Sequence, residues 1–356
     1  AALSSSVTST VSRNGDLIHK MYLEYDPRAA QGTMVANKDL ANNFSHNLIN
    51  EVELEIGGQR IDKHYGHWLQ VWSELTEVNP TGAVAAVGAT GTEPSSGATL
   101  FQTMSYNHTG LANVTGADSA APQKAYVPLQ FWFCRNPGLA LPLIALQYHE
   151  VKVKVSFNAF TDIMQTGGVS GDTFTLSSMK LWVDYIYLDT DERRRFAQQS
   201  HEYLIEQLQL QNTTAASADL NFNHPVKELI WTGIATTPVT GITHGKSNSA
   251  TVSGAGNFKL KLNGHDRFQE RDYRYFTRTQ VAQHHSGFGG VNVRDSIAVY
   301  SFALKPEEHQ PSGTCNFSRI DNARLEMTTA TDLRVYAVNY NVLRVMSGMG
   351  GLAYSN

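Results

Sequence analysis

Cysteine and charged side chains are both scarce in this chain of 356 residues. Its two cysteines, Cys134 and Cys315, cannot make a disulfide framework, and such low usage is typical of a chain that folds in a reducing compartment. Charged residues account for 17% of the sequence, against about 25% in typical globular domains, which excludes a coiled coil or helix bundle rich in Glu, Lys and Arg. Hydrophobic residues account for 41% and the net charge is only −4, so an intrinsically disordered chain is excluded as well.

Long apolar runs and basic stretches are also missing from the sequence. The longest apolar stretch, residues 138–146, is interrupted by Pro142 and is less than half as long as the roughly 20 residues that a membrane helix needs. Residues 1–10 carry neither the basic nor the apolar region of a secretory signal peptide. The sequence contains no basic stripe of the kind that would predict direct contact with nucleic acid. We therefore expect a soluble protein of two domains that is synthesised in the cytosol.

The dominant pattern in the sequence is the two-residue period of β-strands. It is clearest in residues 151–155 (VKVKV) and 259–262 (KLKL), where apolar and charged side chains alternate. Such alternation buries one face of a strand and exposes the other, which is typical of antiparallel sheets. Strands are predicted at residues 20–25, 51–56, 151–157, 179–188, 258–262, 297–304, 323–327 and 332–338. Helical patterns are short, at residues 47–49, 64–78 and 192–198, so the predicted fold class is all-β with short helical insertions.

The strands fall into two halves that resemble each other. Four segments of the first half recur in the same order in the second, with separations that shrink along the chain, as longer loops in the first half would produce. The matched pairs are 16–18 with 228–230, 52–61 with 258–268, 131–133 with 300–302, and 181–185 with 333–337. Two long segments rich in Gly, Ser and Thr, residues 79–121 and 236–256, are predicted to be surface loops on this scaffold.

Each half offers about eight strands with irregular connections, which favours a jelly roll over an immunoglobulin sandwich, whose Cys-Trp-Cys core is missing. We predict two tandem eight-stranded antiparallel jelly-roll (β-sandwich) domains, residues 1–199 and 200–356. Residues 201–211 are predicted to open the second half as a strand, and no equivalent strand precedes Leu17. The first strand of the first domain is therefore expected to be missing from the given chain or supplied by another chain.

The two histidine pairs are the first candidates for a metal site. His64 with His67, and His284 with His285, lack the further ligands that a metal site on a helix or in a cupin barrel would need. We interpret them as surface or capping histidines. The glycine clusters at 287–290 and 348–351 do not sit between a parallel strand and a helix, and no Gly-x-Ser-x-Gly elbow occurs. The sequence therefore predicts no catalysis, no cofactor and no small-molecule substrate.

The charged segment near residue 190 is predicted to be a contact rather than a ligand site. Arg193, Arg194 and Arg195 follow directly on Asp189, Asp191 and Glu192, whose charges cancel theirs. A phosphate site is therefore disfavoured, and we predict that these arginines make an inter-domain or inter-subunit contact.

Asparagines in Asn-x-Ser/Thr triplets are candidate glycan sites, but they matter only where a glycosylation route exists. Such triplets begin at Asn43, Asn107, Asn113, Asn212 and Asn316. Asn107 and Asn113 lie in the first long loop and are the candidates for attachment.

The sequence also leaves two other functions open. One is a carbohydrate-binding β-sandwich protein that uses the loop aromatics Trp72, Phe101, Tyr106 and Phe288, and the other is a cupin-like metalloenzyme.

Several longer motifs resemble one known family. They are SRNGDLI at 12–18, VELEIGGQRIDKHY at 52–65, PGLALPLIALQYHEVK at 137–152, WVDYIYLDTDERRRFAQ at 182–198, HEYLIEQLQ at 201–209, NFNHP at 221–225, FALKP at 302–306, QPSGTCNFSRIDNA at 310–323 and NYNVLRVMSGMGGLAY at 339–354. Together they resemble the double jelly-roll major capsid proteins of nucleocytoplasmic large DNA viruses, most of all the algal, chlorella-virus type. They span nearly the whole chain in the family's order. The long loops differ, and the segment that family members carry ahead of the SRNGDLI motif is not present.

The resemblance implies a structural, non-enzymatic protein found in the virion. Members of the family form homotrimers whose six jelly rolls give a pseudo-hexagonal capsomer, and the capsomers tile an icosahedral shell over an inner membrane. The expected partners are therefore other copies of this chain, neighbouring capsomers, minor capsid proteins and a nearby inner viral membrane. Synthesis and assembly are expected in the host cytoplasm, and the loop 79–121 is expected on the outer face.

Overall fold

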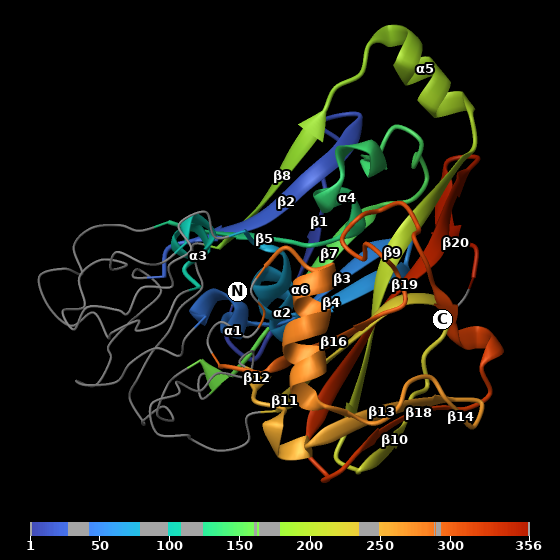
Figure 1. Ribbon diagram of the computed structural model, residues 1–356. Helices are drawn as coiled ribbons and strands as arrows, with labels where there is room; N and C mark the ends of the chain where they lie inside the picture. The colour runs from blue at the N-terminus through green and yellow to red at the C-terminus, as the bar shows by residue number, and fades with distance from the viewer. Residues whose placement is uncertain are drawn as a thin grey trace, which may run out of the picture.

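The computed structural model describes residues 2–27, 43–78, 99–107, 124–159, 162–163, 179–234, 249–287, 289 and 293–354. Most of these residues form antiparallel sheets with a few short helices, as predicted from the two-residue period (Figure 1). Large parts of the predicted loops 79–121 and 236–256 lie outside the described residues. No helix in the described ranges is long and apolar enough to span a bilayer.

The first half of the chain forms two sheets that enclose a common core. One sheet has the strand order β1-β7-β3-β4, and the other places β5, β6 and β8 against β2. The alternation in β7 is reproduced as buried valines between lysines, which puts the apolar face of the sheet on the core. The strands are β1 (Ser6–Thr10), β2 (Leu17–Tyr25), β3 (Ile49–Ile56), β4 (Gln59–Tyr65), β5 (Ala125–Pro128), β6 (Leu141–Pro142), β7 (Val151–Phe157) and β8 (Lys180–Ile186).

The second half repeats this arrangement. One sheet has the order β10-β18-β13-β14 with β15 on β13, and the other places β12, β16, β17 and β19 against β11. In that second sheet β19 also pairs with β9 and β20. The strands are β9 (His201–Thr213), β10 (Ser217–Asp219), β11 (Pro225–Ile234), β12 (Ser249–Ala250), β13 (Asn257–Leu262), β14 (His265–Asp266), β15 (Arg271–Asp272), β16 (Ile297–Ser301), β17 (Cys315–Asn316), β18 (Ala323–Met327), β19 (Leu333–Met346) and β20 (Met349–Leu352).

Three of the four sequence matches occupy the same place in both halves. They pair β2 with β11, β3–β4 with β13–β14, and β8 with β19. The match of 131–133 with 300–302 joins different elements, because Trp132–Arg135 form helix α4 whereas Ile297–Ser301 form β16. Strand β1 is not the counterpart of β9: it pairs with β7, the place that β10 holds on β18.

The helices lie in the connections between strands. Helix α5 has an Asp189 cap whose carboxylate accepts hydrogen bonds from two backbone N–H groups, and it joins the two halves as a projection from the body (Figure 1). A π-helical turn at Tyr275–Thr279 runs into α6 and was not predicted from the sequence. The helices are α1 (Phe44–Leu48), α2 (Gly66–Thr76), α3 (Leu100–Ser105), α4 (Trp132–Arg135), α5 (Thr190–Gln198) and α6 (Gln280–His284).

Candidate functional site

The two jelly rolls meet at a buried junction built around helix α2. Its side chains Trp68, Val71, Trp72 and Leu75 are buried in one hydrophobic cluster with residues of β11, β16 and β19 from the other half. Figure 1 shows α2 beside α6 at the centre of the molecule. Apolar burial of this kind is the main force that would hold two domains together. The relative position of the jelly rolls is therefore fixed by a core rather than by a polar contact alone.

The first histidine pair lies in or beside this junction. His67 Nδ1 lies 2.6 Å from the hydroxyl of Tyr336 and its Nε2 lies 3.0 Å from Ser249 Oγ. Burial, together with the charge of Arg334, lowers the pKa of His67 well below its ordinary value, so the ring is neutral. His64 pairs with Asp62 at 2.9 Å and stacks on Phe131. The interpretation of these two as surface or capping histidines is wrong, because both are buried to 4% exposure.

A charged network crosses the same junction. Glu206 on β9 accepts from Lys227 Nζ at 2.7 Å and pairs with Arg135 of α4 at 2.7 Å. The side chain of Lys227 is fully buried. Burial alone would raise the pKa of Glu206, but the charges of Arg135 and Lys227 outweigh it and lower that pKa. Burial lowers the pKa of Lys227, and Glu206 offsets only part of this. The three charges form one salt-bridged unit that includes both halves of the chain.

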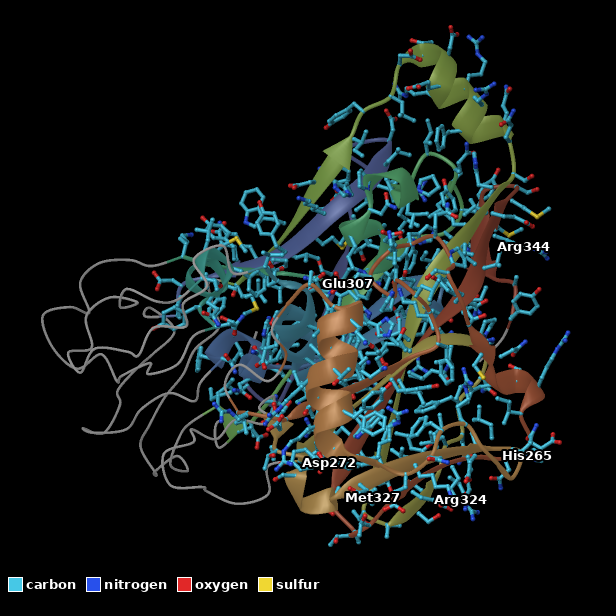
Figure 2. All side chains as sticks on the ribbon, in the orientation of Figure 1. His265, Asp272, Glu307, Arg324, Met327 and Arg344 are labelled. Atoms are coloured by element: carbon cyan, nitrogen blue, oxygen red, sulfur yellow. The ribbon has the colours of Figure 1, made fainter. Side chains whose placement is uncertain are left out.

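The second histidine pair divides into a half-buried and a buried member. His284 lies at the end of α6, near the carbonyl of Leu304. His285 is buried between two carboxylates, with Nε2 at 3.0 Å from Glu228 and Nδ1 at 3.0 Å from Glu307. Figure 2 shows Glu307 at the end of the α6 helix. Burial lowers the pKa of His285, but Glu228 and Glu307 outweigh it and raise that pKa to about 9. The ring is therefore charged at neutral pH, and the surface interpretation is wrong for His285 also.

The segment after α6 is tied to the end of α2 by backbone hydrogen bonds. Gly287 N–H donates to the carbonyl of Leu75 at 2.7 Å, and Gly289 N–H donates to that of Glu74 at 2.9 Å. The Ser286 hydroxyl lies 3.0 Å from the carbonyl of Thr76 and 2.8 Å from Glu307 Oε2. These contacts extend the junction from the sheet faces to the helix ends.

We expect Gly287→Ala to weaken the junction. A Cβ at this position would lie 2.5 Å from the carbonyl carbon of Leu75 and 2.6 Å from Glu74 O, both backbone atoms that cannot move aside alone. Such overpacking costs about 1–3 kcal/mol of unfolding free energy, measurable by urea denaturation. Gly254→Ala is the matched control, because its Cβ would meet nothing nearer than Thr331 Oγ1 at 3.7 Å. Equal losses in the two variants would contradict the close contact.

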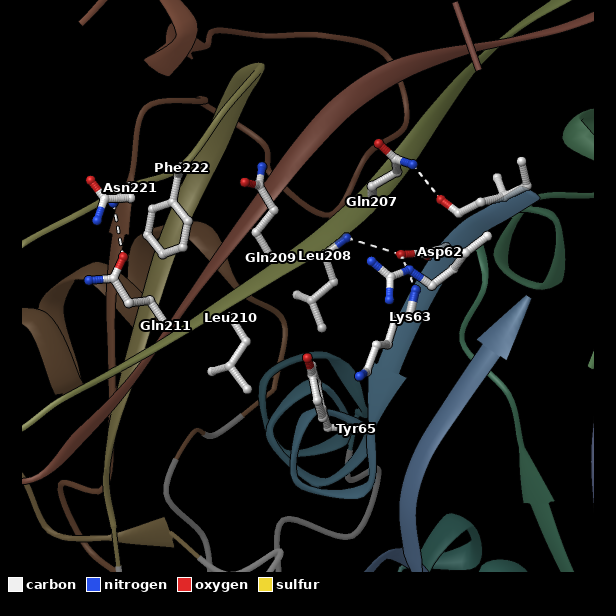
Figure 3. A pocket seen from close by; sticks show the side chains of 12 residues that line it. Asp62, Lys63, Tyr65, Gln207, Leu208, Gln209, Leu210, Gln211, Asn221 and Phe222 are labelled. Atoms are coloured by element: carbon white, nitrogen blue, oxygen red, sulfur yellow. Dashed lines mark hydrogen bonds between the residues drawn. The ribbon is translucent and has the colours of Figure 1, made fainter. Parts of the chain in front are cut away.

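A groove of about 530 Å³ lies between the edge of β4 and strand β9 (Figure 3). Asp62 Oδ1 accepts from the backbone N–H of Leu208 at 3.2 Å, and the Gln207 amide donates to the carbonyl of Ile61. Farther along, the Gln211 side chain accepts from the N–H of Asn221 at 2.9 Å. The groove contains side-chain amides that satisfy backbone groups at strand edges. Across the described ranges no three His, Cys, Asp or Glu side chains come together as metal ligands.

The arginines and asparagines predicted as contact and glycan sites do not come together in one site. Arg193 Nε pairs with Asp16 Oδ1 at 3.0 Å, whereas Arg194 and Arg195 are exposed on α5. Asn107 is buried, accepts from the N–H of His46 and donates to Ser105 Oγ, so its amide is not presented to solvent for glycan attachment. Asn113 lies outside the described residues, and attachment there stays a prediction.

The aromatic residues proposed for carbohydrate binding do not form an exposed platform among the described residues. Trp72 is buried at the junction under the guanidinium of Arg135, at 4.8 Å. Tyr106 is buried against Phe44, and Phe101 is half-buried near His46. Phe288 lies outside the described residues.

Models of two known protein families match the two halves of the chain. A family described as "Major capsid protein N-terminus" matches residues 2–189, and one described as "Large eukaryotic DNA virus major capsid protein" matches residues 192–351. The chain belongs to this major capsid protein family. It is 49% identical to the major capsid protein of Pyramimonas orientalis virus over 98% of this chain and 86% of that protein. It is 39% identical to that of Paramecium bursaria Chlorella virus 1, over 98% and 87%.

Solved structures of capsid proteins have the same fold. The chain superposes on PBCV-1 VP54 with a TM-score of 0.79 and 35% identity, covering all of this chain and 94% of that one. The Faustovirus major capsid protein shares the fold at 13% identity and a TM-score of 0.65, over 97% and 88%. The resemblance drawn from the motifs is confirmed: this is a structural capsid protein of the large-DNA-virus family with the double jelly-roll fold.

Proposed function

We propose that this chain forms homotrimeric, pseudo-hexagonal capsomers that tile an icosahedral shell, and that it does so without catalysis. The observation that supports the proposal is the pair of jelly rolls with matching strand order. They pack against each other through the buried junction of α2 with β11, β16 and β19. A closed trimer of such units has six similar domains around its axis, although only three chains are present.

The division at residues 1–199 and 200–356 is part of this proposal. In the described ranges every strand pair joins strands on the same side of α5, and the two family matches end at 189 and begin at 192. The exposed Arg194 and Arg195 on this connecting helix are proposed to contact a neighbouring subunit. The proposed partners are other copies of this chain, neighbouring capsomers, minor capsid proteins and an inner viral membrane. The chain is proposed to be synthesised and assembled in the host cytoplasm before it becomes part of the virion.

The oligomeric state tests the proposal. We expect sedimentation equilibrium of the purified chain at micromolar concentration to give three times the monomer mass, because an obligate assembly unit persists at such concentrations. Negative-stain images of the same sample should show pseudo-hexagonal particles. A stable monomer that binds an immobilised glycan would overturn the proposal and favour the carbohydrate-binding alternative.

A further inference from the structure

The helix that follows strand β4 has a counterpart in the second jelly roll. Helix α2 begins directly after β4, and a continuous helix at residues 273–284, which includes the π-helical turn and α6, begins directly after β15 (Figure 1). The two helices begin 207 positions apart, at 66 and 273, and Arg60 and Arg267 of the internal repeat have the same separation. The two helices are therefore equivalent parts of the two jelly rolls.

Equivalent positions on the two helices differ in burial on one face only. Leu69 of α2 packs in the core of the first jelly roll, and its counterpart Phe276 packs in the core of the second. The α2 residues buried in the junction are Trp68, Val71, Trp72 and Leu75. Their counterparts on the second helix are Tyr275, Arg278, Thr279 and Ala282. The last three are exposed, so the face that α2 buries is open to solvent on the second helix.

The sheet face that α2 covers also has a counterpart. In the second jelly roll α2 packs on the outward face of β11 and β19, in one cluster with Ile230 and Tyr336. The outward face of β2, β5 and β8 in the first jelly roll carries an aromatic row. Trp182 lies opposite Tyr22 in the strand register, and the rings of Tyr22 and Tyr126 lie 5.9 Å apart. Trp182 and Tyr126 are 45% and 36% exposed, whereas Ile230 and Tyr336 are fully buried.

We propose that the helix at 273–284 of one copy packs on the aromatic row of the next copy, as α2 packs on β11 and β19 within each chain. This inference rests on the proposed homotrimer and assigns the two surfaces that join its subunits. The contact is heterologous because the two surfaces differ, and a threefold rotation closes such contacts into a ring. The same helix-on-sheet contact then alternates around the axis, once within a chain and once between chains.

Two features of the helix at 273–284 favour a second copy as the occupant of the aromatic row. The helix is continuous with the junction, because its Val281 is buried in the same cluster as α2. Its exposed face carries the guanidinium of Arg278, which Asp295 holds at 2.7 Å. Arginine stacks on tyrosine and tryptophan rings, and these three residue types are enriched in protein interfaces.

Variants on the two surfaces test the contact by sedimentation equilibrium. Trp182→Ala on the sheet and Ala282→Glu on the helix should each weaken trimer formation at least tenfold, because one removes an aromatic anchor and the other buries an unpaired charge. Tyr148→Ala is the control, because Tyr148 is 76% exposed and belongs to neither surface. Unchanged trimer formation in Trp182→Ala or Ala282→Glu, or equal weakening by Tyr148→Ala, would overturn the proposal.

A photo-cross-link tests whether the two surfaces meet. Ala282→benzoylphenylalanine, in trimers assembled from isotope-labelled and unlabelled chains, should cross-link to β2, β5 or β8 and give peptide pairs of mixed label. The same analogue at Tyr148 should not reach these strands. A trimer in which residue 282 cross-links only to other segments, or only within its own copy, would overturn this contact and leave the trimer standing. An unmodified chain that stays monomeric would overturn the proposed trimer and this contact with it.

Discussion

Replacement of Glu206 by glutamine should lower the unfolding free energy by about 3–5 kcal/mol, the cost of removing one partner from a buried ion pair. Glu206 pairs with both Lys227 and Arg135, each at 2.7 Å. Lys227 cannot reach solvent, because its side chain is fully buried and its ammonium lies 5.6 Å from the ring of Tyr340. In Glu206→Gln this buried cation loses the carboxylate that it contacts, so unfolding in urea should occur at a lower midpoint.

Two further variants test whether this buried network contributes more to stability than an exposed salt bridge does. The double variant Glu206→Gln with Lys227→Met should recover at least half of the loss, because it removes the stranded charge as well. Lys305→Met breaks the exposed pair with Glu308, whose side chains are 67% and 57% exposed, and should have a much smaller effect because solvent screens this pair. If Glu206→Gln costs no more than Lys305→Met, the network does not hold the junction.

The sequence predicts β7, β18 and several other strands because one face of each is buried. Strand β7 and strand β18 have the predicted bounds, and fully buried residues alternate in both with residues that are less buried. Strand β19 runs eight residues beyond its predicted end at 338, to Met346. The alternation of apolar and polar residues does not predict this extension, because the polar Asn339 and Asn341 are buried as well. Their partners, Gln209 for Asn339 and Gln207 for Asn341, come from β9.

The junction was harder to predict, because its contacts join residues far apart in the sequence. His67 and Tyr336 are separated by 269 positions, and no local pattern relates them. One signal was available: Lys227 and Glu228 interrupt the otherwise apolar start of β11, where charges are costly unless they are paired. The sequence shows both histidine pairs, but it does not show that three of the four residues are buried, because their burial depends on tertiary contacts.

Raising the pH from 7 to 10 should remove stability that depends on His285. Its folded-state pKa of about 9 lies above the ordinary histidine value of 6.5. Because folding raises its pKa, His285 contributes stability that is fully present below pH 6.5 and is lost as the pH rises through about 9. Each pKa unit is worth about 1.4 kcal/mol, so the contribution is about 3 kcal/mol. The physical cause is the loss of two charge-assisted contacts, to Glu228 and Glu307, which would then be two carboxylates around a neutral ring.

His285→Gln isolates this contribution from other groups that titrate nearby. Burial lowers the pKa of Lys227 and raises that of Tyr340, so the unmodified protein reports several groups at once. The difference in unfolding free energy between the unmodified protein and His285→Gln should be largest below pH 6.5 and should shrink by about 3 kcal/mol by pH 10. His284→Gln is the matched control, because the described contact of His284 is with the carbonyl of Leu304 and not with a carboxylate. A pH-independent difference for His285→Gln would show that the ring is not held as a cation. The junction would then depend on its hydrogen bonds and apolar contacts without the charge of His285.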